Sequence, residues 1–596
     1  MVSIPTVKFA GPSDGHGFTL LGFFMGSVSW LRHISSARVL GLRIDRRRFY
    51  SVMPRGEESA AGAEASASAV EASPGMSKKA AQKAAKKAEK ELRQAAALAA
   101  AAAEEEEIDP LADKYGDTKL EDLQSKAVTG RKWTEISELG TDLEGSTVLV
   151  RGRVHSKRAK GKMAFLVLRE TIHTVQCVVS MENVGSKQFV KYASLLSKES
   201  VVDVTGNVSN PRNPVSGTTQ PVEIQVTELH CISKSTNELP LLLEDAARSD
   251  QDIEKAAKEG IQYARVLQDT RLNNRVLDLR IPANQAIFTV QSEISSLFHD
   301  FLRANKFRQI HTPKLIAGAS EGGSAVFKLQ YANDQPACLA QSPQLHKQMA
   351  ICGDFRRVFE IGPVFRAEKS FTHRHLCEFI GLDFEMEIKE HYFEIIDLIG
   401  KLFIYVFNEL NKNCKKELET INSQYPFEPL QYLDETLVLA FAEGIQMLKE
   451  AGFETDPLGD LDTETERRLG LLVKERYKTD FYILHRYPLA VRPFYTMPAV
   501  DDPKYSNSFD VFIRGEEIIS GAQRVHDKDL LLKRIEECNI DPNAIGLQNY
   551  INSFSYGAPP HGGIGVGLER VAMLFCNLDN IRKASLFPRD PNRLAP

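Results

Sequence analysis

Residues 562–570, Gly-Gly-Ile-Gly-Val-Gly-Leu-Glu-Arg, decide the interpretation of the fold. Glycine alternates with aliphatic residues here, which predicts a strand that approaches a ligand closely and continues into a helix over Leu568–Phe575. The glycine spacing does not match G-x-G-x-x-G, and the sequence has no G-K-[ST] triplet. Neither a dinucleotide-binding fingerprint nor a Walker loop is therefore present.

Upstream, residues 357–388 predict two antiparallel strands around a charged loop. In the second strand, apolar residues alternate with Gly381, Asp383, Glu385 and Glu387, so one face is apolar and the other carries carboxylates. Carboxylates that face a cavity need cations, metals or solvent, because an unpaired buried charge is very costly. The loop, residues 365–375, is rich in cations and hydroxyls and suits a polyphosphate, although a solvated surface loop would have the same composition.

A long helix and a short strand precede this hairpin. The helix is predicted over Asn284–Arg303, because apolar residues recur there at spacings of three and four. They are Ile287, Val290, Ile294, Leu297 and Phe301. Phe307–His311 predicts a short strand that ends at Thr312-Pro313, since proline removes a ladder donor. The helix is expected to face a core or a partner.

Residues 147–233 predict a small β domain. Short β-branched runs separated by turn residues give five strands. They are Val148–Val154, Ala164–Arg169, Thr174–Ser180, Ser200–Val208 and Val222–Ile232. This number of strands in about 90 residues fits an OB-type barrel, whose open face binds oligonucleotides, although other small barrels remain open. Phe165 fits a base-stacking platform and, equally well, a core phenylalanine.

The first 107 residues of the chain have a different composition. Residues 1–56 carry eight basic and two acidic side chains and resemble an organellar transit peptide, while Met53 would start a shorter, untargeted product. Residues 59–107 are mostly Ala, Glu, Lys and Ser and cannot supply a tertiary core. Within them, Ser77–Leu98 predicts a helix with a lysine-rich stripe, for which a solvated face is the plainer interpretation.

The expected organisation is therefore α+β. It comprises a leader (1–56), a low-complexity extension that is disordered or helical (57–130), the β domain (131–238), a polar hinge (239–275) and a C-terminal domain (276–596). Hydrophobic residues make up 43% and charged residues 26%, which excludes a wholly disordered or fibrous chain.

Composition also excludes some classes of site. The eight cysteines form no C-x-x-C pair, so neither a disulfide scaffold nor a zinc ribbon is expected. The longest apolar stretch, residues 18–31, is short of the roughly 18 residues that a membrane span needs. No membrane association is therefore expected, and a reducing compartment fits best.

Three signatures stand in order: the helix and strand ending at Thr312-Pro313, Phe365-Arg-Ala-Glu368, and residues 563–570. They resemble motifs 1, 2 and 3 of the class II aminoacyl-tRNA synthetases. Residues 341–347 (Gln-Ser-Pro-Gln-Leu-His-Lys), 492–498 and 520–526 are similar to the aspartate-specific members of subclass IIb, of the eukaryotic and archaeal type. The likeness covers about residues 131–596, and the lysine-rich helix resembles an extension seen in eukaryotic members.

The resemblance implies an OB-fold anticodon-binding domain followed by an antiparallel sheet flanked by helices. It implies ATP-dependent activation of L-aspartate to aspartyl-adenylate and transfer of the aspartyl group to the 3′ end of tRNA(Asp). It further implies a cytoplasmic homodimer that uses Mg²⁺ with ATP and no zinc, while the leader would allow an organelle-targeted form.

The resemblance also assigns residues. Catalytic roles fall to Arg366, Glu517 and Arg570. Aspartate would contact Glu321, Gln344, Lys347, Arg366, Asp383, Ser520 and Arg524, with residues 321–324 as a mobile loop. ATP would contact Arg366, Ala367, Glu368, Arg374, His375, Leu376, Glu517, Gly567, Leu568, Glu569 and Arg570. The tRNA would contact Arg158, Phe165, Gln176, Ser370, Thr372 and, along the lysine-rich helix, Lys79, Lys83, Lys86 and Lys90.

The expected metal ligands are Asp510, Glu517 and Ser520. A two-residue turn at Arg514-Gly515 would set Phe512 opposite Glu517 and place Asp510 on the same face. A salt-bridged surface hairpin is the alternative for this stretch.

Two other functions remain open from sequence. One is an asparaginyl-tRNA synthetase, or an aspartate enzyme that also charges asparagine tRNA. Lys347 and Arg524 favour aspartate as the activated amino acid, because asparagine would leave a buried cation unpaired. The other is a nucleic-acid-binding or signalling protein that has kept the fold without catalysis.

Overall fold

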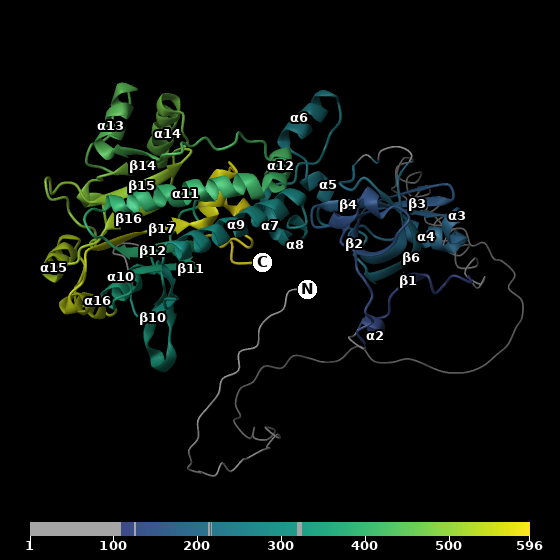
Figure 1. Cartoon of the computed structure of the whole chain (residues 1–596), viewed down its shortest axis with the longest axis horizontal. Helices are drawn as coiled ribbons and strands as arrows, with labels where there is room; N and C mark the ends of the chain where they lie inside the picture. Colours follow the sequence, from purple (N-terminus) through teal and green to yellow (C-terminus); the bar gives the residue numbers. More distant parts are fainter. Residues whose placement is uncertain (1–108, 124–126, 212–214, 216, 319–324) are drawn as a thin grey trace, which may run out of the picture. The chain divides into compact units, whose positions relative to one another are not determined.

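The structure is a computed structural model that describes residues 109–123, 127–211, 215, 217–318 and 325–596 (Figure 1). The predicted leader, the lysine-rich helix and the loop 321–324 lie outside these residues. A small β domain comes first along the described chain, and a larger α+β domain follows it. No helix of the described part is long and apolar enough to cross a membrane.

The β domain contains the five predicted strands, and its OB-type fold is confirmed. They are β2 (Thr147–Lys160), β3 (Met163–Glu170), β4 (His173–Ser180), β5 (Val201–Ser209) and β6 (Glu223–Ser233). β3 pairs antiparallel with β2 and β4, β5 pairs antiparallel with β2 and β6, and β4 pairs parallel with β6. Alternate β-branched side chains such as Val150, Val202 and Val204 are fully buried between the strands. Two helices, α3 (Met181–Val184) and α4 (Lys187–Leu195), connect β4 to β5.

An additional strand precedes this domain in a segment that was expected to be linker. β1 (Tyr115–Asp117) pairs parallel with β6, and α2 (Leu120–Leu123) follows it. The Tyr115 ring stacks on Phe189 with centroids 4.7 Å apart, and its hydroxyl donates to Asp109 at 2.8 Å. One aromatic side chain thus attaches a polar segment to the domain, which composition did not reveal. Short 3₁₀ helices η2 (Ile136–Glu138) and η3 (Thr141–Leu143) lead into β2.

The predicted polar hinge contains three short helices, and a fourth begins at its last residue. They are α5 (Leu243–Ala246), α6 (Asp250–Lys258), α7 (Gln268–Asn273) and α8 (Arg275–Asp278). Leu241, Leu243, Ala246 and Ile281 form a small buried cluster. These apolar side chains explain why the segment is more structured than its charge suggested.

The α+β domain is built on an eight-stranded sheet in the order β13-β14-β15-β16-β17-β12-β11-β7. The central six strands are antiparallel to their neighbours, and the edge strands β13 and β7 pair parallel. The strands are β7 (Arg308–Gln309), β11 (Arg357–Phe365), β12 (Glu378–Glu387), β13 (Leu437–Ala440), β14 (Phe481–His485), β15 (Ser508–Ile513), β16 (Glu516–Gln523) and β17 (His561–Gly567). The predicted hairpin at 357–388 and the glycine-rich strand are therefore confirmed as β11–β12 and β17.

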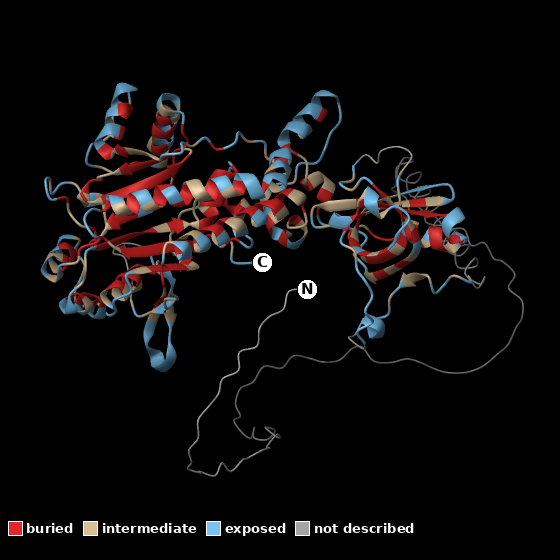
Figure 2. Ribbon diagram, in the orientation of Figure 1, coloured by how far each residue is buried: buried red, intermediate tan, exposed pale blue. Residues whose placement is uncertain are grey.

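Helices cover one face of this sheet and form its main core (Figure 2). These are α9 (Pro282–Ala304), α11 (Phe393–Asn413), α12 (Lys415–Gln424) and α17 (Leu568–Phe575). The helices predicted at 284–303 and 568–575 are confirmed as α9 and α17. On β12, Leu382, Phe384 and Met386 are buried against these helices, while Asp383 and Glu385 alternate with them. The alternation predicted from sequence is thus present, and the carboxylates lie on the face away from the helical core.

The remaining elements surround the other parts of the sheet. They are β8 (Leu315–Ile316), β9 (Lys328–Gln330), β10 (Pro336–Leu339), α10 (Gln344–Cys352), α13 (Phe441–Glu450), α14 (Thr463–Tyr477), α15 (Lys528–Glu537), α16 (Leu547–Ser553) and the 3₁₀ helices η4 (Ala332–Asp334), η5 (Leu489–Val491), η6 (Phe554–Tyr556) and η7 (Ile581–Lys583). β8, β9 and β10 form a separate three-stranded sheet.

Glycine is required in β17 because the neighbouring strand approaches closely. A Cβ atom at Gly563 would lie 2.1 Å from the carbonyl oxygen of Phe384 and 2.8 Å from Cα of Glu385. At Gly567 a Cβ atom would meet only Cβ of Arg570, at 3.6 Å, which is ordinary van der Waals contact.

We therefore expect Gly563→Ala to destabilise the domain by at least about 2 kcal/mol, because backbone atoms of β12 must move to admit the methyl group. Gly567→Ala should change stability by less than about 0.5 kcal/mol. Scanning calorimetry of the two variants measures the difference. Equal melting temperatures would show that β12 and β17 are less tightly packed than described here.

Candidate active site

A cleft of about 430 Å³ opens on the sheet face that carries the carboxylates of β12. Its walls come from β11, β12, β16, β17 and the loop between β11 and β12. Most of the predicted site residues line it together. They are Gln344, Arg366, Glu368, Arg374, His375, Leu376, Asp383, Glu517, Ser520, Arg524, Gly567, Glu569 and Arg570.

Two predicted ATP contacts, Ala367 and Leu568, are not among the residues that line the cleft. Leu568 is 5% exposed and belongs to the apolar core, because it is the first residue of α17 and its side chain packs with the helices. Ala367 donates its backbone N–H to the carbonyl of Ala325 at 3.0 Å. Glu569 lines the cleft, but its carboxylate accepts the backbone N–H of Ile380 at 3.0 Å. Burial raises the pKa of Glu569 to about 7. Ala367 and Leu568 are therefore outside the lining of the cleft, and Glu569 lines it with its carboxylate bound to the backbone of β12.

Two buried ion pairs lie beside the cleft: Asp383 and Arg524 line it, whereas their partners Lys347 and Glu385 do not. Lys347 of α10 is fully buried, and its Nζ donates to Asp383 Oδ1 and to the carbonyl of Ile564, both at 2.8 Å. Arg524 donates from Nε to Glu385 Oε1 at 2.8 Å. The carboxylates of β12 are thus neutralised by two cations, which confirms the requirement inferred from their alternation.

The environment sets the protonation of these carboxyls. Burial raises the pKa of Asp383, and the nearby Lys347 opposes that shift only in part. Burial acts in the same direction on Glu385, but the adjacent Arg524 and Lys347 outweigh it and hold the pKa of Glu385 below its usual value. Glu385 is therefore a stable counterion for Arg524. Sequence analysis gave Glu385 no role, although its place in the carboxylate row pointed to one.

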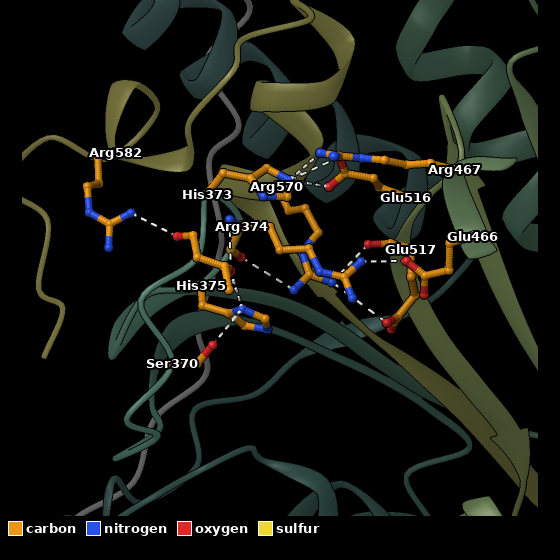
Figure 3. A network of polar contacts seen from close by, with 11 residues as sticks. Ser370, His373, Arg374, His375, Glu466, Arg467, Glu516, Glu517, Arg570 and Arg582 are labelled. Carbon is orange, nitrogen blue, oxygen red and sulfur yellow. Dashed lines mark hydrogen bonds and ion pairs between the residues drawn. The ribbon is translucent and has the colours of Figure 1, made fainter. Parts of the chain in front are cut away.

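The loop between β11 and β12 (residues 366–377, here the β11–β12 loop) carries a polar network, drawn in Figure 3. The hydroxyls of Ser370 and Thr372 lie 3.2 and 2.6 Å from His375 Nδ1. Burial, together with the charges of Arg570 and Arg374, lowers the pKa of His375 to about 4. His375 is therefore neutral near pH 7, and its Nδ1 lies within hydrogen-bonding distance of both hydroxyls.

Helix α14 supplies partners that sequence analysis missed. Glu466 accepts a hydrogen bond from Arg374, and Arg467 donates to Glu516 at 2.6 Å (Figure 3). Burial, reinforced by Glu517, raises the pKa of Glu466 to about 8 in spite of Arg374. These partners are separated by about 50 to 90 positions in the chain, so no local spacing could have revealed them.

The position of α14 depends on two glycines. A Cβ atom at Gly470 of α14 would lie 2.4 Å from Cα of Gly515, which is in the turn between β15 and β16. The absence of side chains at both positions lets the helix rest on this turn. Glu466 and Arg467 are thereby held beside the cleft.

The predicted turn at Arg514-Gly515 is confirmed. Both residues have positive φ, 53° and 75°, and Phe512 lies opposite Glu517 in the register. Glu517 lines the cleft. Its backbone carbonyl accepts a hydrogen bond from Nη1 of Arg570 at 2.8 Å, and its carboxylate Oε2 lies 3.7 Å from the same nitrogen.

Asp510 differs from the expectation of an available metal ligand. It pairs with Ser520 across the strands and is bound by both terminal nitrogens of Arg492, at 2.9 and 2.6 Å. Arg492 also donates to Ser520 Oγ at 3.0 Å and lines the cleft. Its stretch, residues 492–498, was noted in the sequence without a role. Among the described residues no three His, Cys, Asp or Glu side chains come together as a metal-binding group.

In the β domain the structure brings three predicted residues together. Cζ of Arg158 lies 4.6 Å from the centroid of the Phe165 ring, and its Nη2 donates to Gln176 Oε1 at 3.3 Å. Gln176 in turn donates to Glu223 of β6. The Phe165 ring is only partly buried, which favours the platform over the core interpretation.

Comparison with known proteins identifies the family. Residues 267–591 match the model of the class II tRNA synthetases (D, K and N), and residues 148–232 match an OB-fold nucleic acid binding domain. Aspartate–tRNA ligase 1, cytoplasmic, of Arabidopsis thaliana is 62% identical over 492 residues, which cover 83% of this chain and 92% of the relative. The chain belongs to the class II tRNA synthetases and, within them, to the aspartate–tRNA ligases.

Solved structures agree with this membership. Aspartyl tRNA synthetase from Entamoeba histolytica aligns with a TM-score of 0.75 at 47% identity, covering 81% of this chain and 96% of that one. Asparaginyl-tRNA synthetase from Pyrococcus horikoshii, complexed with asparaginyl-adenylate, aligns with a TM-score of 0.66 at 30% identity, covering 78% and 100%. This aspartate–tRNA ligase is thus more similar to the aspartate enzyme, and the resemblance stated from sequence is confirmed.

The environment of His375 in this ligase predicts a pH effect on stability. The folded pKa of about 4 lies below the ordinary value of 6.5, so between these pH values the unfolded chain binds the extra proton. Stability contributed by neutral His375 is present above pH 6.5 and is lost as the pH falls toward 4.

Lowering the pH from 7 to 4.5 should reduce the free energy of unfolding of both proteins. We expect the reduction to be about 2 kcal/mol smaller for His375→Gln than for the unsubstituted protein. Urea denaturation at the two pH values measures this difference, and the exposed His311→Gln serves as control. If the His375 and His311 variants respond identically to acid, the described burial of His375 is wrong.

Proposed function

We propose that this aspartate–tRNA ligase binds L-aspartate and ATP in the cleft and uses the residues described above to form aspartyl-adenylate. In this step the α-carboxylate of aspartate attacks the α-phosphorus of ATP, the α–β phosphoanhydride bond breaks, and pyrophosphate leaves. The aspartyl group then passes to the terminal ribose hydroxyl of tRNA(Asp), and AMP leaves. The observation that carries the proposal is that one cleft is lined both by members of two buried ion pairs, Asp383 and Arg524, and by three further arginines, Arg366, Arg374 and Arg570.

The ion pairs form the proposed amino-acid pocket. Within the described residues, the hydrogen bonds of Arg524 to Glu385 and Gln344 use Nε and Nη2 and leave the two Nη1 donors for a ligand. The side-chain carboxylate of aspartate fits these donors, with Lys347 adding positive charge from below. Asparagine would replace this charged contact by a neutral amide in a buried site, which is the basis of discrimination. Asp383 and Gln344 would contact the substrate ammonium. Glu321, which lies outside the described residues, would be a further contact to aspartate.

The arginines form the proposed ATP side. Arg366 would hold the α-phosphate and the attacking carboxylate, Arg374 the outer phosphates, and Arg570 the γ-phosphate and the adenine face. Arginine suits these tasks because its planar guanidinium donates two parallel hydrogen bonds to a phosphate. The chemistry needs no protein nucleophile, so positioning and charge neutralisation are the contribution of these side chains.

Magnesium fits this cleft through Glu517, whose carboxylate is 31% exposed beside Arg570. Ser520 lines the same wall, whereas Asp510 would have to give up a hydrogen bond from Arg492 to contribute. A hard divalent cation here would neutralise phosphate charge. Glu517 would hold it, and Arg492 would keep Asp510 and Ser520 in place.

The β domain is the proposed anticodon reader. Phe165 would stack on a base, while Arg158 and Gln176 would hydrogen-bond base edges. Ser370 and Thr372 of the β11–β12 loop would meet the acceptor end. Lys79, Lys83, Lys86 and Lys90 would bind phosphates regardless of sequence.

Assembly and location complete the proposal. α9 and the edge strand β7 would form an isologous homodimer interface. The related Arabidopsis protein is named cytoplasmic, and we assign this chain to the cytoplasm, with an organelle-targeted form through residues 1–56.

Amino-acid-dependent ATP–pyrophosphate exchange tests the pocket. We expect exchange with aspartate and none above background with asparagine. Arg524→Lys should lower kcat/KM for aspartate about 100-fold, because a point charge replaces the planar fork, and should leave the KM for ATP within twofold.

Arg534→Lys is the matched control for this exchange experiment, since Arg534 is also buried and paired, with Glu537, but lies on α15. It should behave like the unsubstituted protein. Exchange driven as well by asparagine as by aspartate would refute the assigned pocket.

Phe165→Ala tests the anticodon reader. Loss of a stacking platform should raise the KM for tRNA(Asp) about 10- to 100-fold, since base–aromatic stacking contributes about 1–3 kcal/mol. Pyrophosphate exchange, which needs no tRNA, should be unchanged. Trp133→Ala removes another aromatic–arginine pair of the same domain, with Arg151 Cζ at 4.9 Å, and is the control. A similar tRNA defect in both variants would assign the effect to the domain as a whole.

A further inference from the structure

The β11–β12 loop is attached to the chain that follows α17. Nη1 of Arg582 donates to the carbonyl of Thr372 at 3.0 Å, and the backbone N–H of Ile581 donates to the carbonyl of His373 at 2.8 Å. At the end of the loop, the N–H of Cys377 donates to the carbonyl of Arg589 at 2.7 Å. Residues 581–590, here called the C-terminal clamp, thus bind the backbone of the loop at three points.

Arg582 is the centre of this clamp. It is 2% exposed, its Nε donates to Asp590 Oδ2 at 2.6 Å, and its Cζ lies 4.3 Å from the centroid of the Phe371 ring. The Asp590 side chain is equally buried. The Arg582 guanidinium is thus bound by a carboxylate, a carbonyl and the face of a ring. These three contacts together fix its orientation.

The opposite side of the loop is held differently. There Arg374 and His373 contact Glu466 and Glu516 through their side chains (Figure 3). A phosphate would compete with Glu466 for Arg374, so that contact depends on whether ATP is bound. The clamp instead contacts backbone carbonyl and N–H groups of the loop, so a phosphate would not compete with it for the side chain of Arg374.

The contacts of the clamp fall directly before the proposed ATP-binding side chains. Thr372 and His373 precede Arg374 and His375 in the chain, and because the peptide unit is planar, a carbonyl held in place also fixes the backbone nitrogen of the next residue. Figure 3 shows Arg582 reaching the loop from one side while Glu466 and Glu516 lie on the other.

We propose that Arg582, held by Asp590, is a positioning residue for adenylate formation: it fixes the backbone at Thr372 so that Arg374 and His375 are oriented toward the phosphates before ATP binds. This inference rests on the proposed function, because it requires Arg374 to contact ATP. Pre-organisation of this kind removes an ordering penalty from ATP binding and leaves aspartate binding unaffected.

The test is ATP–pyrophosphate exchange on the full chain, with ATP and aspartate varied separately. Arg582→Lys keeps a positive charge that can pair with Asp590, but an ammonium group cannot at the same time bind the Thr372 carbonyl and stack on the Phe371 ring. We expect Arg582→Lys to raise the KM for ATP about tenfold, with the KM for aspartate within twofold. Phe371→Leu, which removes the ring against Arg582, should raise the KM for ATP about threefold. Because Phe371 is exposed, this variant should fold even if Arg582→Lys does not, and it tests the same contact.

A double variant separates positioning from general destabilisation. If Arg582 acts through Arg374, then Arg582→Lys combined with Arg374→Ala should raise the KM for ATP no more than about twofold beyond Arg374→Ala alone. Arg169→Lys is the matched control, since its ion pair with Glu199 in the β domain is as deeply buried. It should lower the melting temperature without changing either KM.

The outcomes distinguish the two proposals. A raised KM for ATP in Arg374→Ala together with an unchanged KM in Arg582→Lys and Phe371→Leu would overturn the inference and leave the proposed function standing. An unchanged KM for ATP in Arg374→Ala would overturn both. Equal rises in the KM values for ATP and aspartate in Arg582→Lys would show a merely structural role and would also overturn the inference.

Discussion

The site depends on the neutralisation of two buried carboxylates by two buried cations. Asp383 and Glu385 extend from one strand, and Lys347 and Arg524 reach them from α10 and from the chain after β16. Removing either cation would leave an uncompensated charge in a medium that solvates it poorly, so each partner requires the other. The strand, the helix and the cleft wall are thereby bound into one unit, and their relative positions define the proposed amino-acid pocket.

The sheet makes this arrangement geometrically available. β12 presents apolar side chains to the helices and charged ones to the cleft, while β17 beside it contributes glycines in place of side chains. Asp383 lies opposite Gly565 in the register, so the carboxylate has room that any larger residue would fill. The cleft therefore exists because β12 alternates apolar and charged residues, and because β17 places glycines, Gly565 and Gly567, along the cleft.

Local patterns in the sequence predicted a large part of this structure. The alternation in β12, the strand-to-helix transition at Gly567–Leu568 and the turn at Arg514-Gly515 are all set by neighbouring residues, and each is present. The pairings that sequence reasoning missed join distant segments, such as Arg374 with Glu466 and Arg492 with Asp510. Periodicity carries no information about which distant side chain a cation will meet, because that depends on how α14 and β15 are placed in three dimensions. A motif also names neighbours in the chain without saying which side chains face the cleft: Leu568 packs in the apolar core, whereas Arg570, two residues on, lines the cleft.

The balanced charge of the pocket has a consequence for the evolution of specificity. The charges of the two carboxylates and the two cations already balance before a substrate enters the proposed pocket. A substrate side-chain carboxylate then adds one negative charge, whereas a side-chain amide adds none. A single replacement that changes the charge at any of the four positions alters both the resting balance and the balance with substrate bound. A new preference would therefore require compensating replacements at two positions, and any lineage that passes through the intermediate carries an unmatched ion in its core.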